Sequence, residues 1–241
     1  MRLTYIYHSC YTIEAANFTI IIDYYKDSIN DHQGVIHDRI LHRPYPLYVL
    51  STHGHHDHFN PEILTWKELR SDIRYIFSED IRSVIKEPSE DITFIAKDGE
   101  YKDELLTINA YGSTDLGVSF KITRGDNVLF HAGDLNNWHW NEESTEDEIK
   151  EAEAFYEREL NHVAATTPAV GLAMFPVDPR LGKDYMKGAE QFLSKIETAL
   201  IAPMHFDTAY EKAAQIEDIA KKYGTSAFIP QRRGEMYKGE V

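Results

Sequence analysis

The sequence predicts an α/β (α+β) fold in a single domain that spans residues 1–241. Two β-rich runs open the chain, and strands alternate with amphipathic helices in its second half. No Gly/Ser-rich linker and no short repeat divides the sequence. The 241 residues are 42% hydrophobic and 27% charged, which is typical of a globular protein that buries its core without disulfides.

Strands are predicted where β-branched, aromatic and apolar residues form short runs between turn residues. Residues 3–13 and 18–25 are predicted to be the two strands of a hairpin, because the second run bears no charge before Asp23. The short apolar run 47–51 ends at a polar cluster and predicts a buried strand. Further strands are predicted at 75–77, 92–96, 104–110, 117–123, 128–132, 170–175, 199–202 and 226–229.

The first helix is predicted to begin at Asn60 and Pro61 and to continue to Leu69. Asparagine is a favoured cap at a helix N-terminus, and proline suits the first helical turn. Other helices are predicted from their apolar residues at 78–86, 142–161, 185–197 and 208–223. The polar stretch 26–46 is predicted to be a surface loop, and it carries His32, His37 and His42.

The charge and cysteine content exclude several classes of protein. Lys and Arg number 25 against 40 Asp and Glu, and the net charge of −15 opposes binding to a phosphate backbone. Cys10 is the only cysteine, which excludes an internal disulfide and a thiolate-rich metal cluster. The sequence has no apolar signal core and no run of 18 apolar residues. We therefore expect a cytoplasmic protein with no nucleic-acid or membrane partner.

The segment Thr52–His58 reads Thr-His-Gly-His-His-Asp-His and follows an apolar run directly. Its pattern, His-x-His-x-Asp-His, supplies imidazole nitrogens and a carboxylate, which are ligands for borderline divalent metals. Gly54 lets the backbone bend so that neighbouring side chains can converge. The alternatives are an exposed polar loop or the remnant of an affinity tag, but a tag lies at a terminus and lacks the aspartate. The segment therefore predicts a metal site.

Two later segments are candidates for further ligands. His131-Ala132-Gly133-Asp134 ends a predicted strand with a carboxylate, and His205 follows the apolar run 199–202. A Gly-Asp pair is usually a turn, and a lone histidine is usually structural. With a metal motif already in the chain both become candidates, because metal sites draw ligands from several strand ends.

In these motifs the chain resembles the metal-dependent hydrolases of the metallo-β-lactamase fold, and within them the small bacterial UlaG-like branch. The resemblance implies a four-layer αββα sandwich with the metal site at one edge. It also implies that one or two divalent ions bind, zinc first, with manganese or iron as alternatives. The matching segments run in order along the chain: Tyr7–Tyr11, Ile21–Asp23, Thr52–His58, His131–Asp134 and Pro203–His205.

The resemblance assigns ligands residue by residue. His53 and His55 would bind the first metal, Asp57, His58 and His205 the second, and Asp134 would bridge them. The family usually supplies a third histidine for the first metal, but this chain has no histidine from 59 to 130. The expected place lies near Tyr111–Asp115. Asp115, Ser113, a water or His139 could fill the position; otherwise the first site is weak or empty.

A metal-activated water is the nucleophile that such ligands imply. Asp57 is predicted to orient that nucleophile, and His8, His131 and His139 are candidates for orienting or proton-donating roles. An ordinary strand histidine is the alternative for His8. The segment 136–140 is either a pocket wall or a loop packed on the core. We favour the wall, with substrate contacts from Asn136, Asn137 and Trp138.

Three functions compete. We favour a hydrolase of a small ester, lactone or phosphodiester, with a small molecule as its substrate. A nuclease of the same fold is the first alternative, and the net charge of −15 counts against it. A metal-binding protein with a degenerate, non-catalytic site is the second, and the missing histidine supports it. Substrate, metal identity and oligomeric state do not follow from the sequence.

Overall fold

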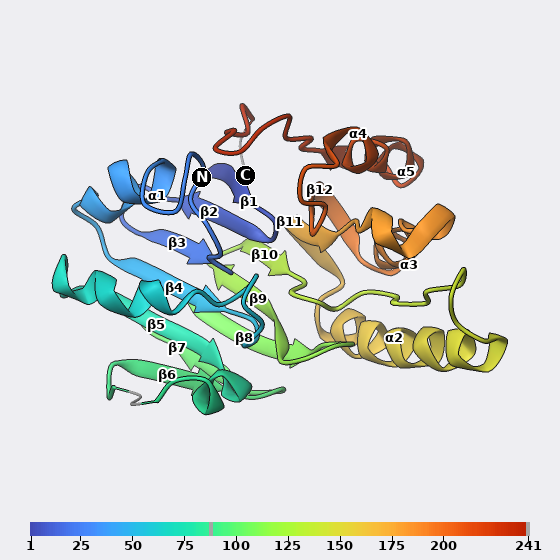
Figure 1. Cartoon of the computed structure of the whole chain (residues 1–241), viewed down its shortest axis with the longest axis horizontal. Helices are drawn as coiled ribbons and strands as arrows, with labels where there is room; N and C mark the ends of the chain where they lie inside the picture. The colour runs from blue at the N-terminus through green and yellow to red at the C-terminus, as the bar shows by residue number, and fades with distance from the viewer. Residues whose placement is uncertain (87–88, 240–241) are drawn as a thin grey trace. The chain divides into compact units, whose positions relative to one another are not determined.

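The computed structural model describes residues 1–86 and 89–239 (Figure 1). The chain divides into two compact units. The N-terminal unit comprises residues 1–96 and the segment from residue 230 onward, and the C-terminal unit comprises residues 97–229. Each unit contains one β-sheet. The single domain predicted over residues 1–241 stays a prediction.

The sheet of the N-terminal unit has the strand order β1-β2-β3-β4-β5-β6. The pairs from β1 to β3 are antiparallel, and those from β3 to β6 are parallel. Strand β1 therefore runs in the direction of β3 and β4, so the C-terminal ends of these three strands lie at one edge of the sheet. The strands are β1 (Arg2–Tyr7), β2 (Cys10–Glu14), β3 (Thr19–Ile22), β4 (Leu47–Ser51), β5 (Ile73–Ser78) and β6 (Ile92–Ile95).

The predicted strand 3–13 is wrong in one respect, because it is itself a hairpin of β1 and β2. Tyr7 pairs with Cys10, so the turn consists of His8 and Ser9 alone. His8 adopts a φ of 54°, in the left-handed region that usually calls for glycine or asparagine. The turn carries neither residue, so residue patterns alone do not predict it, although the segment Tyr7–Tyr11 resembles a hairpin of the family.

Short helices cover the N-terminal sheet: α1 (Val35–Asp38), η1 (Ile40–His42), η2 (Pro61–Glu68) and η3 (Glu79–Ser83). The predicted loop 26–46 thus includes α1 and η1. The helices predicted at 60–69 and 78–86 exist only as 3₁₀ turns, which are tighter than the α-helix and occur as short connectors. Asn60 does cap η2, since its side chain accepts a hydrogen bond from the Glu62 amide. Buried apolar side chains such as Ile36, Ile63 and Trp66 pack onto the strands.

The sheet of the C-terminal unit has the order β13-β12-β11-β10-β9-β8-β7. It repeats the pattern of the first sheet, with antiparallel pairs from β7 to β10 and parallel pairs from β10 to β13. Strands β8, β10, β11 and β12 consequently end at one edge. The strands are β7 (Glu100–Lys102), β8 (Thr107–Gly112), β9 (Val118–Arg124), β10 (Asn127–His131), β11 (Ala169–Pro176), β12 (Glu197–Met204) and β13 (Ser226–Ala227).

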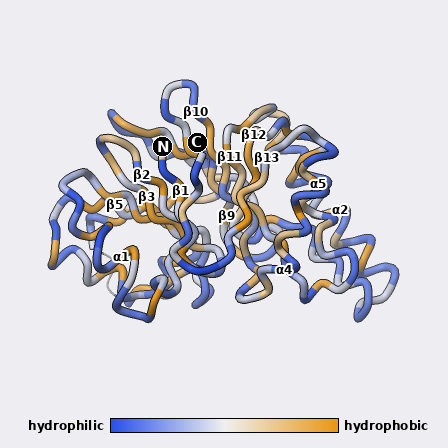
Figure 2. The backbone as a smooth tube through the Cα atoms, turned by 90° about the horizontal axis from the view of Figure 1, so that it is seen from above, coloured by the Kyte–Doolittle hydropathy of each residue, from blue (hydrophilic) through white to orange (hydrophobic). Residues whose placement is uncertain are grey.

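Helices of the C-terminal unit pack on its sheet, with α2 against β8, α3 against β11 and β12, and α5 against β13. Figure 2 shows apolar residues along the strands and many hydrophilic ones around α2. The helix predicted at 142–161 begins later, after the Thr145 cap, and the helix predicted at 208–223 is two short helices. The bounds are α2 (Glu146–Thr166), η4 (Pro179–Asp184), α3 (Lys187–Lys195), α4 (Tyr210–Ala213) and α5 (Ile216–Lys222).

Across residues 1–86 and 89–239, none of the helices combines the length and the apolar character needed to span a lipid bilayer. In both units the candidate site residues follow the C-terminal ends of strands. This is where ligands bind in open α/β sheets, because side chains from several loops can meet there. His8, Asp23 and Thr52–His58 follow β1, β3 and β4, whereas Asp115, Asp134, Asp178 and His205 follow β8, β10, β11 and β12.

Candidate metal centre

The motif loop of the N-terminal unit leaves the buried end of β4 and turns back on itself. The amides of His58 and Phe59 both donate to the carbonyl of His55, at 3.0 and 2.8 Å. Gly54 lies close to η3, where its amide donates to the Asp80 carboxylate at 2.8 Å. A Cβ atom at this position would come within 2.9 Å of a Val84 methyl group, so a larger residue would have to displace that side chain.

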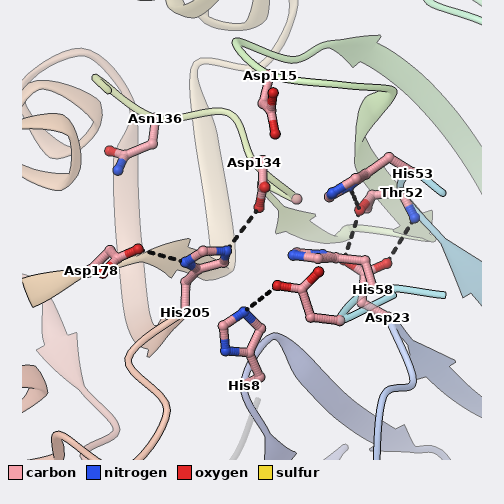
Figure 3. A network of polar contacts seen from close by, with 12 residues as sticks. His8, Asp23, Thr52, His53, His58, Asp115, Asp134, Asn136, Asp178 and His205 are labelled. Atoms are coloured by element: carbon pink, nitrogen blue, oxygen red, sulfur yellow. Dashed lines mark hydrogen bonds and ion pairs between the residues drawn. The ribbon is translucent and has the colours of Figure 1, made fainter. Parts of the chain in front are cut away.

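Asp23, at the end of β3, anchors this loop through a fully buried carboxylate. Its Oδ1 accepts from the Thr52 amide at 2.7 Å, and its Oδ2 accepts from the Thr52 hydroxyl at 2.7 Å and from His58 Nδ1 at 2.8 Å. Figure 3 shows the contacts of Thr52 and His58 with Asp23. Three hydrogen bonds to one buried carboxylate fix the start and the end of the motif.

These bonds also set which nitrogen of two imidazoles carries the proton. His58 donates from Nδ1 to Asp23, so its lone pair is on Nε2. The Thr52 hydroxyl donates its only proton to Asp23, so it must accept the hydrogen bond from His53 Nδ1, at 3.1 Å. His53 consequently also has its lone pair on Nε2. A carboxylate behind a ligating histidine fixes the tautomer and raises the basicity of the ligand, which is the usual arrangement at metal sites.

Asp57 and His8 complete the cluster of the N-terminal unit. His8 Nε2 lies 3.3 Å from Asp57 Oδ2, and ligand atoms of His8, Asp57 and His58 lie within 4.8 Å of one another. Burial raises the pKa of Asp57, but the hydrogen bond from His8 and the electrostatic influence of His58 and His8 outweigh it and hold the pKa well below its ordinary value. His55 is exposed, and its ring centroid lies 4.8 Å from that of His53.

In the C-terminal unit a row of three side chains, Asp178, His205 and Asp134, joins the ends of β11, β12 and β10 (Figure 3). His205 Nδ1 donates to Asp178 Oδ2 at 2.9 Å, and His205 Nε2 lies 3.5 Å from Asp134 Oδ1. All three side chains are buried. Asp178 thus does for His205 what Asp23 does for His58: it fixes the proton on Nδ1 and directs Nε2 toward a carboxylate ligand.

Arg180 holds Asp178 in place from the start of η4. Its guanidinium donates to both carboxylate oxygens, from Nε at 3.0 Å and from Nη2 at 2.6 Å. Burial raises the pKa of Asp178, but the hydrogen bonds from His205 and Arg180 prevail and keep the pKa well below its ordinary value. Asp178 is therefore ionised, as a carboxylate that orients a metal-binding histidine must be.

Asp115 lies beside Asp134 because Thr114 ties their two loops together. The Thr114 hydroxyl accepts from the Asn136 amide at 2.9 Å and lies 2.6 Å from the Asn136 carbonyl. A carboxylate oxygen of Asp115 lies within 4.8 Å of one of Asp134. Asp115 stands in the stretch Tyr111–Asp115, where the third histidine was expected, so this unit offers a carboxylate near that position.

A cavity of about 300 Å³ adjoins these residues within the C-terminal unit. The rings of Trp138 and Trp140 stack at 6.3 Å with an angle of 15° between their planes, and Trp138 N–H donates to the Asp134 carbonyl at 2.8 Å. This places one predicted substrate-binding residue, Trp138, on a cavity wall. The lining residues are Thr114, Asp115, Asp134, Trp138, Trp140, Arg180 and His205.

The other predicted residues of this region are buried and lie outside that lining. Asn136 and Asn137 are fully buried, and the Asn137 amide donates to Gln191 at 2.9 Å. His139 Nε2 lies 3.2 Å from the Asp184 carbonyl, and its Nδ1 accepts from the Asn141 amide at 3.2 Å. His131 is buried too, with Nδ1 accepting from the Gly133 amide.

The donor groups fit a divalent metal of the zinc type. The N-terminal unit offers imidazoles and the Asp57 carboxylate, the C-terminal unit offers His205 with two carboxylates, and three of the imidazoles have Nδ1 bound so that Nε2 is the ligand atom. Sequence reasoning missed the groups that arrange this. Asp23, Thr52, Asp178 and Arg180 bind no metal in the predicted scheme. Asp23 and Thr52 lie in segments that match the family, and Asp178 lies just beyond a strand end, but none of these signals assigns a role.

Three solved structures of similar fold are distant from this chain in sequence. A metallo hydrolase from the archaeon Ignicoccus hospitalis has 16% identity, with 99% of each chain covered and a TM-score of 0.68. The metallo-β-lactamase fold protein YhfI from Bacillus subtilis has 12% identity, with 99% of this chain and 98% of YhfI covered, and a TM-score of 0.64. The diiron β-hydroxylase CmlA from Streptomyces venezuelae also has 12% identity and a TM-score of 0.64, but the match covers 98% of this chain and only 53% of CmlA.

At these identities the likeness shows the fold alone, and it confirms the predicted mixed α/β fold with two sheets and flanking helices. Among proteins with curated descriptions, none matches the chain. The family described as the beta-lactamase superfamily domain matches residues 2–205, which include every predicted metal ligand. The chain belongs to the β-lactamase superfamily.

Proposed function

We propose that the protein is a metal-dependent hydrolase of a small ester, lactone or phosphodiester. The observation that carries the proposal is that a buried carboxylate orients an imidazole in both units, Asp23 for His58 and Asp178 for His205. The proposed metal ligands are His53, His55, Asp57 and His58 in the N-terminal unit and Asp134 and His205 in the C-terminal unit. The family and fold support this assignment.

One or two divalent ions fit the donor set, with zinc preferred and manganese or iron as alternatives. We propose that Asp115 takes the place of the missing third histidine, because its carboxylate lies within 4.8 Å of Asp134. If two ions bind, Asp134 is the residue that would hold both. The diiron centre named for CmlA shows that a protein of this fold can hold iron, and we carry only that possibility to this chain.

When bound, such an ion supplies Lewis-acid polarisation and makes water a nucleophile at neutral pH. The protein's own groups position the reactants. Asp57, kept ionised by His8 and His58, accepts a hydrogen bond from the attacking water and orients it. His8, 3.3 Å from Asp57, holds that carboxylate in place and can pass a proton to a leaving group.

The cavity of the C-terminal unit supports a small, flat or cyclic substrate, because Trp138 and Trp140 present stacked aromatic faces on its wall. Substrate contacts from Asn136 and Asn137, and a catalytic role for His139, stay predictions.

Finer assignments are also proposals. The order of the matching segments supports the UlaG-like bacterial branch, and the composition supports a cytoplasmic location and a small-molecule partner, with neither nucleic acid nor membrane as a partner. A nuclease of the same fold is the first alternative, and the net charge of −15 opposes it. A degenerate, non-catalytic metal site is the second alternative, and the absence of a histidine from 59 to 130 supports it.

The test combines metal content with hydrolysis. The purified full chain is stripped with a chelator, reloaded with zinc, manganese or iron, and assayed on nitrophenyl esters, lactones and bis(nitrophenyl) phosphate. We expect hydrolysis of at least one class that is lost on stripping and restored by metal. Metal uptake without turnover of any class would favour the degenerate site. Failure to take up metal would overturn both readings.

A further inference from the structure

A second group of metal-binding side chains lies in the N-terminal unit, on residues that the proposed centre does not use. His32 and His37 belong to the segment between β3 and β4, and Glu62 is in the first turn of η2. His37 Nε2 lies 2.7 Å from Glu62 Oε1, and His32 Nδ1 lies 3.3 Å from the same oxygen. Ligand atoms of all three lie within 4.8 Å of one another.

Asp27 gives this group the arrangement found at the proposed centre. Its carboxylate is fully buried and accepts from the backbone amides of Ser28, Ile36 and His37 at 2.6, 3.1 and 2.8 Å. The same carboxylate accepts from His37 Nδ1 at 2.9 Å. The proton of His37 is thereby placed on Nδ1, and Nε2 is directed toward Glu62, as a ligating nitrogen with a carboxylate behind it is.

The surroundings hold the His37 ring in this orientation. Its edge-on neighbours are Tyr24 and Trp66, with ring centroids 6.3 and 6.0 Å away. The start of its helix is fixed by Ser28, whose hydroxyl accepts from the Val35 amide at 2.9 Å. The His32 side chain is 77% exposed, so the group opens to solvent on one side and an ion can enter.

Hydrogen bonds alone would require a proton on both ring nitrogens of His37, because Nδ1 donates to Asp27 and Nε2 faces Glu62. His32 Nδ1 would then donate to the same Glu62 oxygen. A divalent cation would satisfy all three donor atoms, and its two charges would balance the carboxylates of Asp27 and Glu62. Two imidazoles and one carboxylate suit zinc, with the fourth position open to water.

We propose that His32, His37 and Glu62 bind a divalent transition-metal ion of the zinc type at a site separate from the superfamily's centre. The ion joins the segment that leads into β4 to η2, which follows the motif loop. Its effect is on the stability of the folded chain, since a ligand that binds only the folded state raises the free energy of unfolding. The proposal does not depend on the hydrolase activity.

The experiment counts zinc ions in the full chain after chelator treatment and titration with zinc against a chromophoric chelator. The variants are His32→Ala and Glu62→Gln, which change an exposed ring and a partly exposed carboxylate. The control is His42→Ala, an exposed histidine of the same segment. We expect one ion fewer, and a smaller zinc-induced rise in Tm, for the two variants than for the wild type and His42→Ala.

Equal stoichiometry in all four proteins would overturn the proposal and leave an ion pair. Loss of the ion in His42→Ala as well would also overturn it, because any exposed histidine would then suffice. His55→Ala separates this site from the proposed centre, since it should lose metal there and keep the ion that His32→Ala loses. If His55→Ala and His32→Ala lose the same ion, the cluster of His32, His37 and Glu62 binds no separate ion and the proposal is overturned.

Discussion

The two units supply candidate metal ligands in different ways. In the N-terminal unit they are contiguous, because Thr52–His58 forms one loop after β4. In the C-terminal unit they are single residues, Asp115, Asp134 and His205, that follow three different strands. The loop can be recognised from local sequence, whereas the scattered set exists only because parallel strands end together. Both units nevertheless use a buried carboxylate behind a histidine.

The largest effect is expected from removing two ligands of the contiguous loop. His55→Ala combined with His58→Ala should abolish metal uptake at the proposed centre, because it removes two of the four ligands that the loop supplies. Metal per chain is measured in a background that also carries His32→Ala, so that the second cluster does not contribute. His56→Ala, an exposed neighbour in the same loop, is the matched control and should bind as the parent does. Full retention in the double variant would reject the assignment.

Asp23→Asn should give the next largest effect, and it should act on stability as well as on metal. The carboxylate is fully buried and accepts three hydrogen bonds. In asparagine an NH2 group replaces one of its oxygens, and this group cannot accept the hydrogen bonds that the oxygen accepted. Because hydrogen bonds to a buried charged group contribute about 1.5–3 kcal/mol each, we expect the metal-free chain to lose about 3 kcal/mol in its free energy of unfolding. Urea denaturation measures this, and an unchanged midpoint would contradict the anchoring role.

Asp178→Asn tests the buried carboxylate that orients a histidine in the C-terminal unit. It should lower the free energy of unfolding less than Asp23→Asn does. Its partner Arg180 has a side chain that is 61% exposed, so water can replace part of the hydrogen bonding between Arg180 and Asp178. We expect metal affinity to fall about 10–100-fold, as for other groups that orient a ligand from behind. Asp184→Asn, which removes an exposed charge from the same helix η4, should leave affinity unchanged. Equal affinities in the two variants would show that His205 needs no such support.

The contrast between the units also explains how far the sequence could be read. The strand at 47–51 was predicted correctly, and the motif loop follows it, because the apolar strand and the loop with the candidate ligands are adjacent in the chain. The turn at His8 and Ser9 carries no glycine, so it was suggested only by the family resemblance of Tyr7–Tyr11. Strand β7 was missed because three residues with two charges leave no apolar pattern. Asp23 and Asp178 look like any aspartate after a strand. Their roles depend on which strands lie side by side, and single-residue patterns do not encode that.

The smallest predicted effect isolates the link between Asp23 and His53. Thr52→Val keeps the backbone bond to Asp23 but removes the hydroxyl that donates to Asp23 and accepts from His53. The variant removes the hydroxyl that accepts from His53 Nδ1, so we expect metal affinity to fall about tenfold, at the low end for such groups. The loss of hydrogen bonds should lower the free energy of unfolding by about 1 kcal/mol.

Thr12→Val is the matched control for that variant, because Thr12 is an equally buried threonine of β2 in the same unit, and its hydroxyl lies outside the contacts of Asp23. It should leave metal affinity as it is. If Thr52→Val binds metal as tightly as Thr12→Val, the proton of His53 is not placed by Thr52, and the buried carboxylate of the N-terminal unit orients one histidine instead of two. The two units would then match, with one carboxylate for one imidazole in each.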